Sequence, residues 1–140
     1  MIEPKPVEEV IAVAEPDPRV RVLIVDDQRP FRAAATAVVE SIDGFEVVDA
    51  VETAEQAIDG IERTGPELVL MDLNLPGMDG VTASRLLRER YPEIMVVLLS
   101  SYDEAEFTDL ISDCGASAYV PKASFGPERL ETLWRERSGR

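Results

Sequence analysis

Cysteine is nearly absent from this chain of 140 residues, and its scarcity excludes two kinds of scaffold. Cys114 is the only cysteine, so neither a disulfide framework nor a cysteine metal site can form within one chain. No apolar stretch approaches the ~20 residues of a membrane-spanning helix, so no membrane insertion is expected. The N-terminus is acidic and proline-rich, unlike the basic and then apolar start of a signal peptide. Together these features favour a cytoplasmic protein.

Positive charge is also scarce. Lysine and arginine number 14 against 28 aspartates and glutamates, and histidine is missing, which gives a net charge of −14. Surfaces that contact nucleic acid depend on clustered Lys and Arg side chains. Direct binding of nucleic acid by this chain is therefore not expected. The length corresponds to one domain, which is large enough to bury a core without disulfides or a structural metal.

The first 19 residues differ in composition from the rest of the chain. They contain four prolines and five acidic residues: Pro4, Pro6, Pro16, Pro18, Glu3, Glu8, Glu9, Glu15 and Asp17. Such a composition is typical of a linker or tail. We therefore divide the chain into an acidic, proline-rich N-terminal tail, residues 1–19, and a folded domain, residues 20–140. The apolar patch at residues 10–13 leaves open whether part of the tail docks as a turn of helix or as an added strand.

From residue 20 onward, apolar strand-like runs alternate with helix-like stretches. The expected strands are residues 20–26, 45–51, 67–72, 94–100 and 117–121, and the expected helices are 30–41, 53–64, 79–91, 104–114 and 126–137. Thr53 followed by Gln56 is typical of a capping box that opens the second helix, and Gly65 is placed to end it. Strands that alternate with helices in this way predict an α/β fold, with a parallel sheet covered by helices on both faces.

Acidic residues and one lysine stand at the ends of these strand-like runs. Asp26 and Asp27 end the first run, Asp72 ends the third, and Lys122 ends the fifth. The strand ends of a parallel α/β sheet converge on one crevice, so these side chains should meet. Carboxylates at close range raise one another's pKa unless a cation lies among them, and a hard divalent metal with oxygen ligands, Mg²⁺ above all, fits that need. A carboxylate beside Mg²⁺ and a lysine is suited to receiving a phosphoryl group.

The chain resembles the receiver domain of bacterial two-component response regulators, from about residue 20 to residue 137. The resemblance rests on motifs at the ends of the first, third, fourth and fifth strands: Val-Asp-Asp at 25–27, Met-Asp-Leu-Asn-Leu-Pro-Gly-Met-Asp-Gly at 71–80, Leu-Ser-Ser at 99–101 and Tyr-Val-Pro-Lys at 119–122. It implies a doubly wound, flavodoxin-like parallel sheet in the order 2-1-3-4-5. The motifs are most like those of receivers that belong to small helix-turn-helix output proteins, although no output domain follows in this sequence.

The resemblance implies a role for each acidic residue. Asp72 matches the aspartate that accepts a phosphoryl group from a histidine kinase. Asp27 matches a direct Mg²⁺ ligand, and Asp26 matches one that reaches the metal through water. Asn74 stands two residues after the acceptor, where the family uses the backbone carbonyl as a further metal ligand. Mg²⁺ is thus the implied cofactor, and a histidine kinase the implied partner.

The resemblance also implies how the signal leaves the site. Lys122 matches the lysine that contacts the phosphoryl oxygens, and Ser100 the hydroxyl residue that hydrogen-bonds the transferred group. Tyr119 matches an aromatic switch residue whose ring swings in when Ser100 moves. A phosphoryl group adds about −1.5 to −2 charge and three acceptor oxygens, enough to bias such a packing element. The expected output surface is the fourth helix, fifth strand and fifth helix, which would bind an unknown output protein or a second copy of the chain.

Other functions compete with this interpretation. The chain could be the receiver part of a longer DNA-binding transcriptional regulator, or a pseudo-receiver that binds partners without phosphorylation. An aspartyl-phosphate phosphatase is a further class, but such enzymes place a second Asp two residues after the nucleophile, and Asn74 stands there. We therefore expect no enzyme activity beyond self-catalysed phosphoryl acceptance and autodephosphorylation.

Overall fold

The computed structural model describes residues 19–101 and 115–138, and within them the chain forms a five-stranded parallel sheet. The strands are β1 (Val20–Val25), β2 (Phe45–Val51), β3 (Leu68–Asp72), β4 (Met95–Ser100) and β5 (Ala118–Pro121), in the order β2-β1-β3-β4-β5. Every neighbouring pair is parallel. The predicted fold class and strand order are confirmed.

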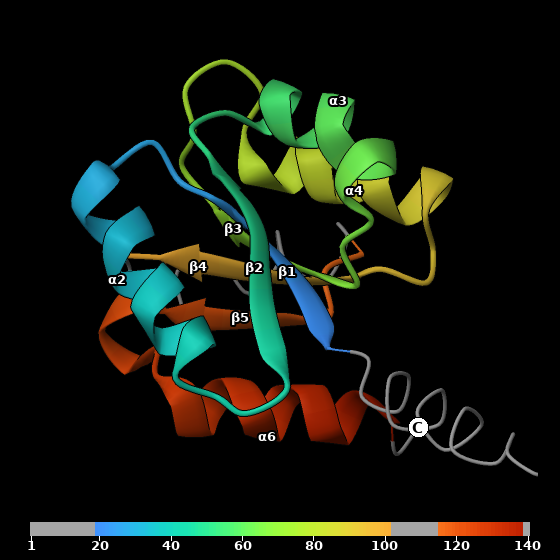
Figure 1. Cartoon of the computed structure of the whole chain (residues 1–140). Helices are drawn as coiled ribbons and strands as arrows, with labels where there is room; N and C mark the ends of the chain where they lie inside the picture. The colour runs from blue at the N-terminus through green and yellow to red at the C-terminus, as the bar shows by residue number, and fades with distance from the viewer. Residues whose placement is uncertain (1–18, 102–114, 139–140) are drawn as a thin grey trace, which may run out of the picture.

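Helices cover both faces of the sheet (Figure 1). Helices α3 (Ala54–Thr64) and α4 (Gly80–Arg90) lie on one face, and α2 (Arg29–Glu40) and α6 (Pro127–Ser138) lie on the other. A short 3₁₀ turn, η2 (Lys122–Ser124), joins β5 to α6. The predicted helix at 104–114 lies outside the described residues. Within the described ranges, no helix has both the length and the apolar character needed to cross a membrane.

Local sequence signals set the ends of α3. The Thr53 hydroxyl accepts a hydrogen bond from the backbone N–H of Gln56, and the Gln56 side chain accepts one from the backbone N–H of Thr53. This is the predicted capping box, which satisfies two donors that a helix start leaves without partners. Gly65 ends the helix with φ of 60°, a left-handed conformation that glycine adopts without steric cost.

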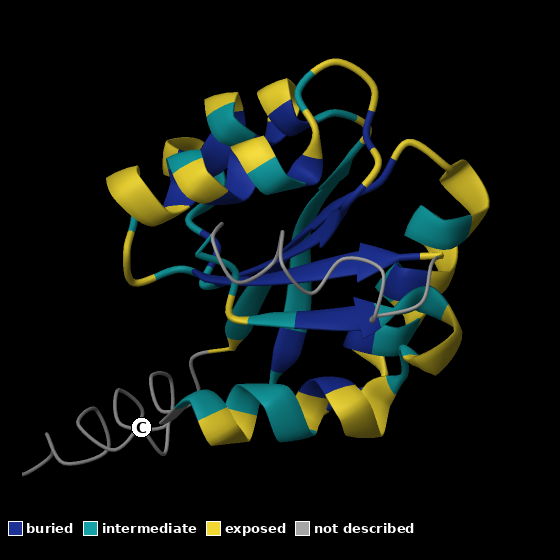
Figure 2. Ribbon diagram, turned by 180° about the vertical axis from the view of Figure 1, so that it is seen from behind, coloured by how far each residue is buried: buried dark blue, intermediate teal, exposed yellow. Residues whose placement is uncertain are grey.

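The central strands β3 and β4 are buried along their whole length, as the centre of a parallel sheet requires, whereas the edge strand β2 is mostly half-buried. In β3, Val69 and Met71 belong to the core beneath α3 and α4, whereas Leu68 and Leu70 belong to the core beneath α2 and α6. Figure 2 shows dark, buried strands at the centre of the sheet, with half-buried strand segments at its margins, between helices whose outer surfaces are largely exposed. Because successive side chains of a strand point to opposite faces, the register of β3 is fixed by two cores at once.

Strand register brings the predicted site residues to one edge of the sheet. Val25 pairs with Met71, so the next residues along the two strands, Asp26 and Asp72, are neighbours. Ser100 pairs with Pro121, which places Lys122 directly beyond the same edge. The carboxyl ends of β1, β3, β4 and β5 therefore meet where the sequence predicts the site.

At Gly80, its first residue, α4 closely approaches the backbone at the end of β3. A Cβ at Gly80 would collide with the carbonyl oxygen of Asp72 and lie 2.9 Å from the Cα of Leu73. Backbone atoms cannot move aside without shifting the Asp72 loop, so Gly80→Ala should lower the free energy of unfolding by about 1–3 kcal/mol. Gly126→Ala is the matched control because nothing lies within 4 Å of its Cβ position. Chemical denaturation measures both, and equal stability of the two variants would contradict the close approach.

Candidate functional site

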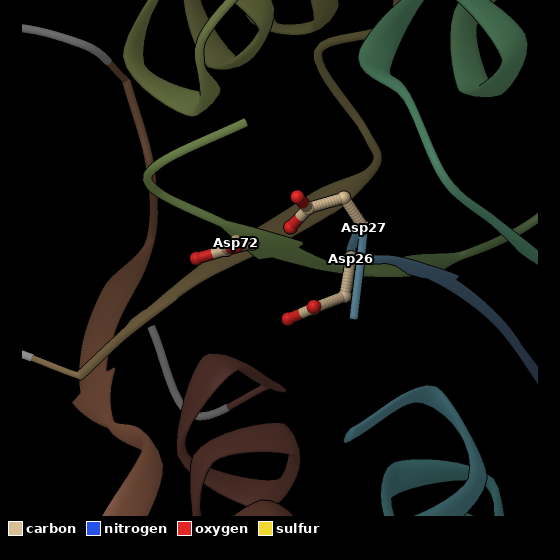
Figure 3. A group of neighbouring side chains, drawn as sticks. All are labelled: Asp26, Asp27 and Asp72. Atoms are coloured by element: carbon tan, nitrogen blue, oxygen red, sulfur yellow. The ribbon is translucent and has the colours of Figure 1, made fainter. Parts of the chain in front are cut away.

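Three carboxylates converge beyond the ends of β1 and β3 (Figure 3). One oxygen from each of Asp26, Asp27 and Asp72 lies within 4.8 Å of the others. Asp26 and Asp72 are 1% and 5% exposed, whereas Asp27 is exposed at the mouth of the site. Two buried carboxylates and one open to solvent form a cluster that a cation can enter from outside.

Lys122 supplies positive charge to the buried pair. Its Nζ lies 2.7 Å from Asp26 Oδ2 and 3.7 Å from Asp72 Oδ2. Asp26 Oδ2 is buried and accepts no well-aligned hydrogen bond from the described residues, so the nearby ammonium is what offsets its charge. The ion pair between Lys122 and Asp26 stabilises this oxygen even without good hydrogen-bond geometry, because charge attraction depends less on angle than a hydrogen bond does.

The second carboxylate oxygen of Asp26 and that of Asp72 are each held by a backbone N–H. Asp26 Oδ1 accepts a hydrogen bond of 2.8 Å from the Gln28 N–H, and Asp72 Oδ1 accepts a longer one of 3.3 Å from the Asn74 N–H. One ammonium does not neutralise three carboxylates, and the oxygen lone pairs that remain are hard donors. The donor set fits a hard divalent cation such as Mg²⁺, which prefers carboxylate and carbonyl oxygens and keeps several waters.

A small cavity of about 200 Å³ opens beside the cluster. Its lining residues are Asp27, Gln28, Asp72, Asn74, Ser101 and Lys122. Four of the predicted site residues thus line one cavity, and Asp26 lies at its buried side in contact with Lys122. The cavity has room for an ion with its waters or for a phosphoryl group.

Ser100 and Tyr119 are placed differently from the cavity-lining residues. Ser100 is fully buried at the end of β4, and the neighbouring Ser101 lines the cavity instead. Tyr119 is 5% exposed and belongs to the core beneath α3 and α4. Its ring is therefore already buried in this structure, and the proposed movement of the ring stays a prediction.

Two functional contacts come from residues that the strand-end pattern does not mark. Arg32 donates a hydrogen bond of 2.8 Å to the backbone carbonyl of Asp26, and its guanidinium lies 3.7 Å from Glu52. The ring of Phe31 lies under the Lys122 ammonium, 4.5 Å from ring centroid to Nζ. Both residues belong to the first turn of α2, where a search confined to strand ends does not look. Ser101 carries a weak signal, as the second residue of the Ser-Ser pair.

A larger cavity of about 550 Å³ lies at the opposite edge of the sheet. It is lined by residues near the amino ends of the strands, including Arg21, Glu67 and Ile94, and by Trp134 and Arg137 of α6. Size does not make it the functional site, because the converging carboxylates and Lys122 lie at the other edge.

The environment of Asp72 changes its acidity. Burial first, and then the nearby Asp26 carboxylate, raise the pKa of Asp72 from 3.8 to about 6, against the opposing effect of the Lys122 ammonium. A group with a raised pKa in the folded state stabilises the fold when it is protonated. That contribution is complete below about pH 4 and is lost as the pH rises through about 6.

This shift predicts how the metal-free protein responds to pH. In the presence of a chelator, Asp72→Asn should be more stable than the wild type at about pH 7.5, by roughly 1–3 kcal/mol, because it removes a buried negative charge. As the pH falls towards about 3 the difference should disappear, since the wild-type carboxyl then becomes protonated in both the folded and the unfolded state. Asp43→Asn, at an exposed position, is the control and should be neutral. Thermal unfolding across this pH range measures the effect, and a constant difference would contradict the shift.

Known proteins share this chain's sequence pattern and fold. The family model of the response regulator receiver domain matches residues 22–135. The transcriptional regulatory protein DegU of Brevibacillus brevis is 35% identical over 115 residues, which is 82% of this chain and 49% of DegU. The response regulator GacA of Pseudomonas protegens is 34% identical over 114 residues, 81% of this chain and 54% of GacA. The chain spans about half the length of these curated relatives.

Solved structures agree in topology. The receiver domain of the response regulator NarL from Mycobacterium tuberculosis superposes with a TM-score of 0.77 at 27% identity, over 88% of this chain and 99% of that domain. A CheY-like receiver domain protein from Methanospirillum hungatei superposes with a TM-score of 0.74 at 27% identity, over 85% of this chain and 93% of that protein. Receivers are regulatory domains rather than enzymes in the ordinary sense. With its sequence, strand order and acidic cluster all in agreement, the chain belongs to the receiver domain family of two-component response regulators.

Proposed function

We propose that Asp72 accepts a phosphoryl group from a histidine kinase and that this modification switches a protein-interaction surface. The observation that carries the proposal is the placement of Asp72: it ends a central strand, lines the 200 Å³ cavity and has two carboxylates and an ammonium around it. In the transfer, an Asp72 oxygen bonds to phosphorus while the bond from phosphorus to the kinase imidazole nitrogen breaks. The product is an acyl phosphate, and the departing imidazole takes up a proton.

Mg²⁺ is the cofactor that the site would hold. The carboxylates of Asp26, Asp27 and Asp72 and the backbone carbonyl of Asn74 would bind it, with Asp27 as a direct ligand and Asp26 acting through water. Bound Mg²⁺ would offset negative charge on the phosphoryl group. Lys122, which directly follows β5, adds a second positive charge. Its position beside Asp72 suits a contact to the phosphoryl oxygens.

Ser100 and Tyr119 would carry the change away from the acceptor. Ser100 ends β4 beside the acceptor strand, and its hydroxyl would donate to a phosphoryl oxygen after a small movement. Tyr119 pairs with Leu98, which stands two residues before Ser100 on β4. A shift of Ser100 at the end of β4 would therefore change the packing of Tyr119. The proposed output surface is β5 and α6 together with the segment at 102–114 that precedes β5 and lies outside the described residues. An output protein or a second copy of the chain would bind there.

The proposal includes the division of the chain and the fate of the phosphoryl group. Residues 1–19 would be a tail, and residues 20–140 the receiver. Hydrolysis of the acyl phosphate would be self-catalysed, with no separate active site. A role in gene regulation is favoured by the relatives, since DegU is named a transcriptional regulatory protein. This chain is strongly acidic and is not expected to bind DNA itself. In that case a separate DNA-binding output partner would bind the switched surface.

Phosphorylation at a single site is the first test. With acetyl phosphate and Mg²⁺, the wild type should gain the mass of one phosphoryl group, and Asp72→Asn should gain none, because the amide is not a nucleophile. Asp79→Asn is the control from the same motif and should be modified like the wild type. Intact-mass spectrometry reads all three, and modification of Asp72→Asn would show that the acceptor lies elsewhere.

Metal binding is the second test. Asp27→Ala removes the exposed carboxylate of the cluster and should weaken Mg²⁺ binding by at least about tenfold. Asp43→Ala removes one exposed negative charge elsewhere and should leave the affinity unchanged, which separates ligation from general charge. Isothermal titration calorimetry measures the affinity. The ligand role of Asp27 is wrong if both variants bind Mg²⁺ equally well.

A further inference from the structure

We propose that Phe31 is a positioning residue that holds the Lys122 ammonium beside the phosphoryl acceptor. This inference rests on the proposed function of Asp72. The Lys122 Nζ lies 4.5 Å from the centroid of the Phe31 ring. A cation over an aromatic face within about 6 Å is attracted by the ring's quadrupole, and the attraction grows as water is removed. The Lys122 side chain is only 13% exposed, so the contact is largely desolvated.

Lys122 needs such a contact because its side chain is long and its partners compete. The ammonium lies 2.7 Å from Asp26 Oδ2 but 3.7 Å from Asp72 Oδ2, so it is closer to the carboxylate that does not accept the phosphoryl group. A lysine has four rotatable side-chain bonds and loses up to about 2 kcal/mol of conformational freedom when it is fixed. Contact with the Phe31 ring restricts the movement of the ammonium and so helps to keep Nζ close to both carboxylates.

Phe31 also contacts the turn from which Lys122 projects. Lys122 opens η2, and the N–H of Phe125 donates a hydrogen bond of 3.2 Å to the Lys122 carbonyl to close it. The Phe125 ring packs against Phe31 with a centroid distance of 6.1 Å and a tilt of 51°. Phe31 therefore contacts both the charged end of the lysine and the residue that closes its backbone turn. The base and the tip of the side chain are positioned by one ring.

The location of Phe31 makes this more than local packing. It lies in the first turn of α2, next to Arg32, whose guanidinium donates to the backbone carbonyl of Asp26. Consecutive residues of one helix thus hold Asp26 and Lys122, which are far apart in sequence. The first turn of α2 thereby sets the position of Lys122 relative to the backbone of Asp26. We infer that Phe31 favours the ammonium position that serves phosphoryl transfer to Asp72.

Phosphorylation rates of the full chain test the role. Phe31→Leu keeps an apolar side chain and removes the aromatic face, so it should slow phosphoryl incorporation from acetyl phosphate by roughly three- to tenfold at saturating Mg²⁺. Phe31→Tyr keeps the face and should react at the wild-type rate. Phe45→Leu is the matched control, since Phe45 packs against Trp134 at the amino end of β2. It should also react like the wild type, and none of the variants should change Mg²⁺ affinity.

A second measurement does not depend on phosphorylation. The chain contains two lysines, Lys5 and Lys122, so ¹³C-lysine labelling gives a simple NMR spectrum, and Lys122→Gln assigns the signals. The Phe31 ring current should shift the Lys122 Hε protons upfield in the wild type and in Phe31→Tyr. The shift should be absent in Phe31→Leu.

The outcomes separate the inference from the proposed function. A wild type that takes up no phosphoryl group refutes the function, and the Lys122 ring-current shift then decides the Phe31 contact alone. A phosphorylated wild type with an equally fast Phe31→Leu variant overturns the positioning role and leaves the function intact. Equal slowing of Phe31→Leu and Phe31→Tyr also overturns it, since packing would then be the cause. If Phe31→Leu fails to fold, a wild-type spectrum without the shift overturns it.

Discussion

Three carboxylates that repel one another lie at one edge of the sheet, and the fold must hold them together. Asp26 and Asp72 are almost fully buried, and burial together with the Asp26 carboxylate disfavours the charged form of Asp72. Lys122 offsets part of this repulsion, at 2.7 Å from one carboxylate and 3.7 Å from the other. One ammonium among three carboxylates leaves the site short of positive charge, and its oxygen donors fit a divalent cation. Burial, and then the Asp26 carboxylate, keep the pKa of Asp72 raised in the metal-free protein.

The rest of the fold supports this unfavourable cluster. Apolar side chains on both faces of β3 hold the acceptor strand in register between β1 and β4. The backbone of Gly80 packs against the end of the same strand, so α4 begins where Asp72 is presented. Cores on two faces stabilise the domain enough to tolerate local charge repulsion, because burial of apolar surface is the dominant favourable term in folding.

Most of the fold could be predicted from the sequence, because its signals are local. Each described strand and helix begins and ends within about two residues of its predicted position. The Thr53 capping box and the Gly65 helix end were correct since both depend on neighbours in the chain. The site was predicted through a topological rule, namely that the ends of parallel strands meet. That rule identified Asp26, Asp27, Asp72 and Lys122, which the structure brings together.

The sequence by itself determined the alternation of strands and helices, and with it which residues stand at strand ends. Only the tertiary structure decided that Phe31 lies against Lys122 and that Arg32 bonds the backbone of Asp26, because these contacts come from the side chains of a helix and not from strand ends. Phe31 and Arg32 stand in an ordinary helical turn, and no local pattern distinguishes them from surface residues. Likewise, only packing decided that Ser101 lines the cavity while Ser100 is buried. Periodicity fixes the face on which a residue lies, but distances between elements depend on how their side chains fill the space between them.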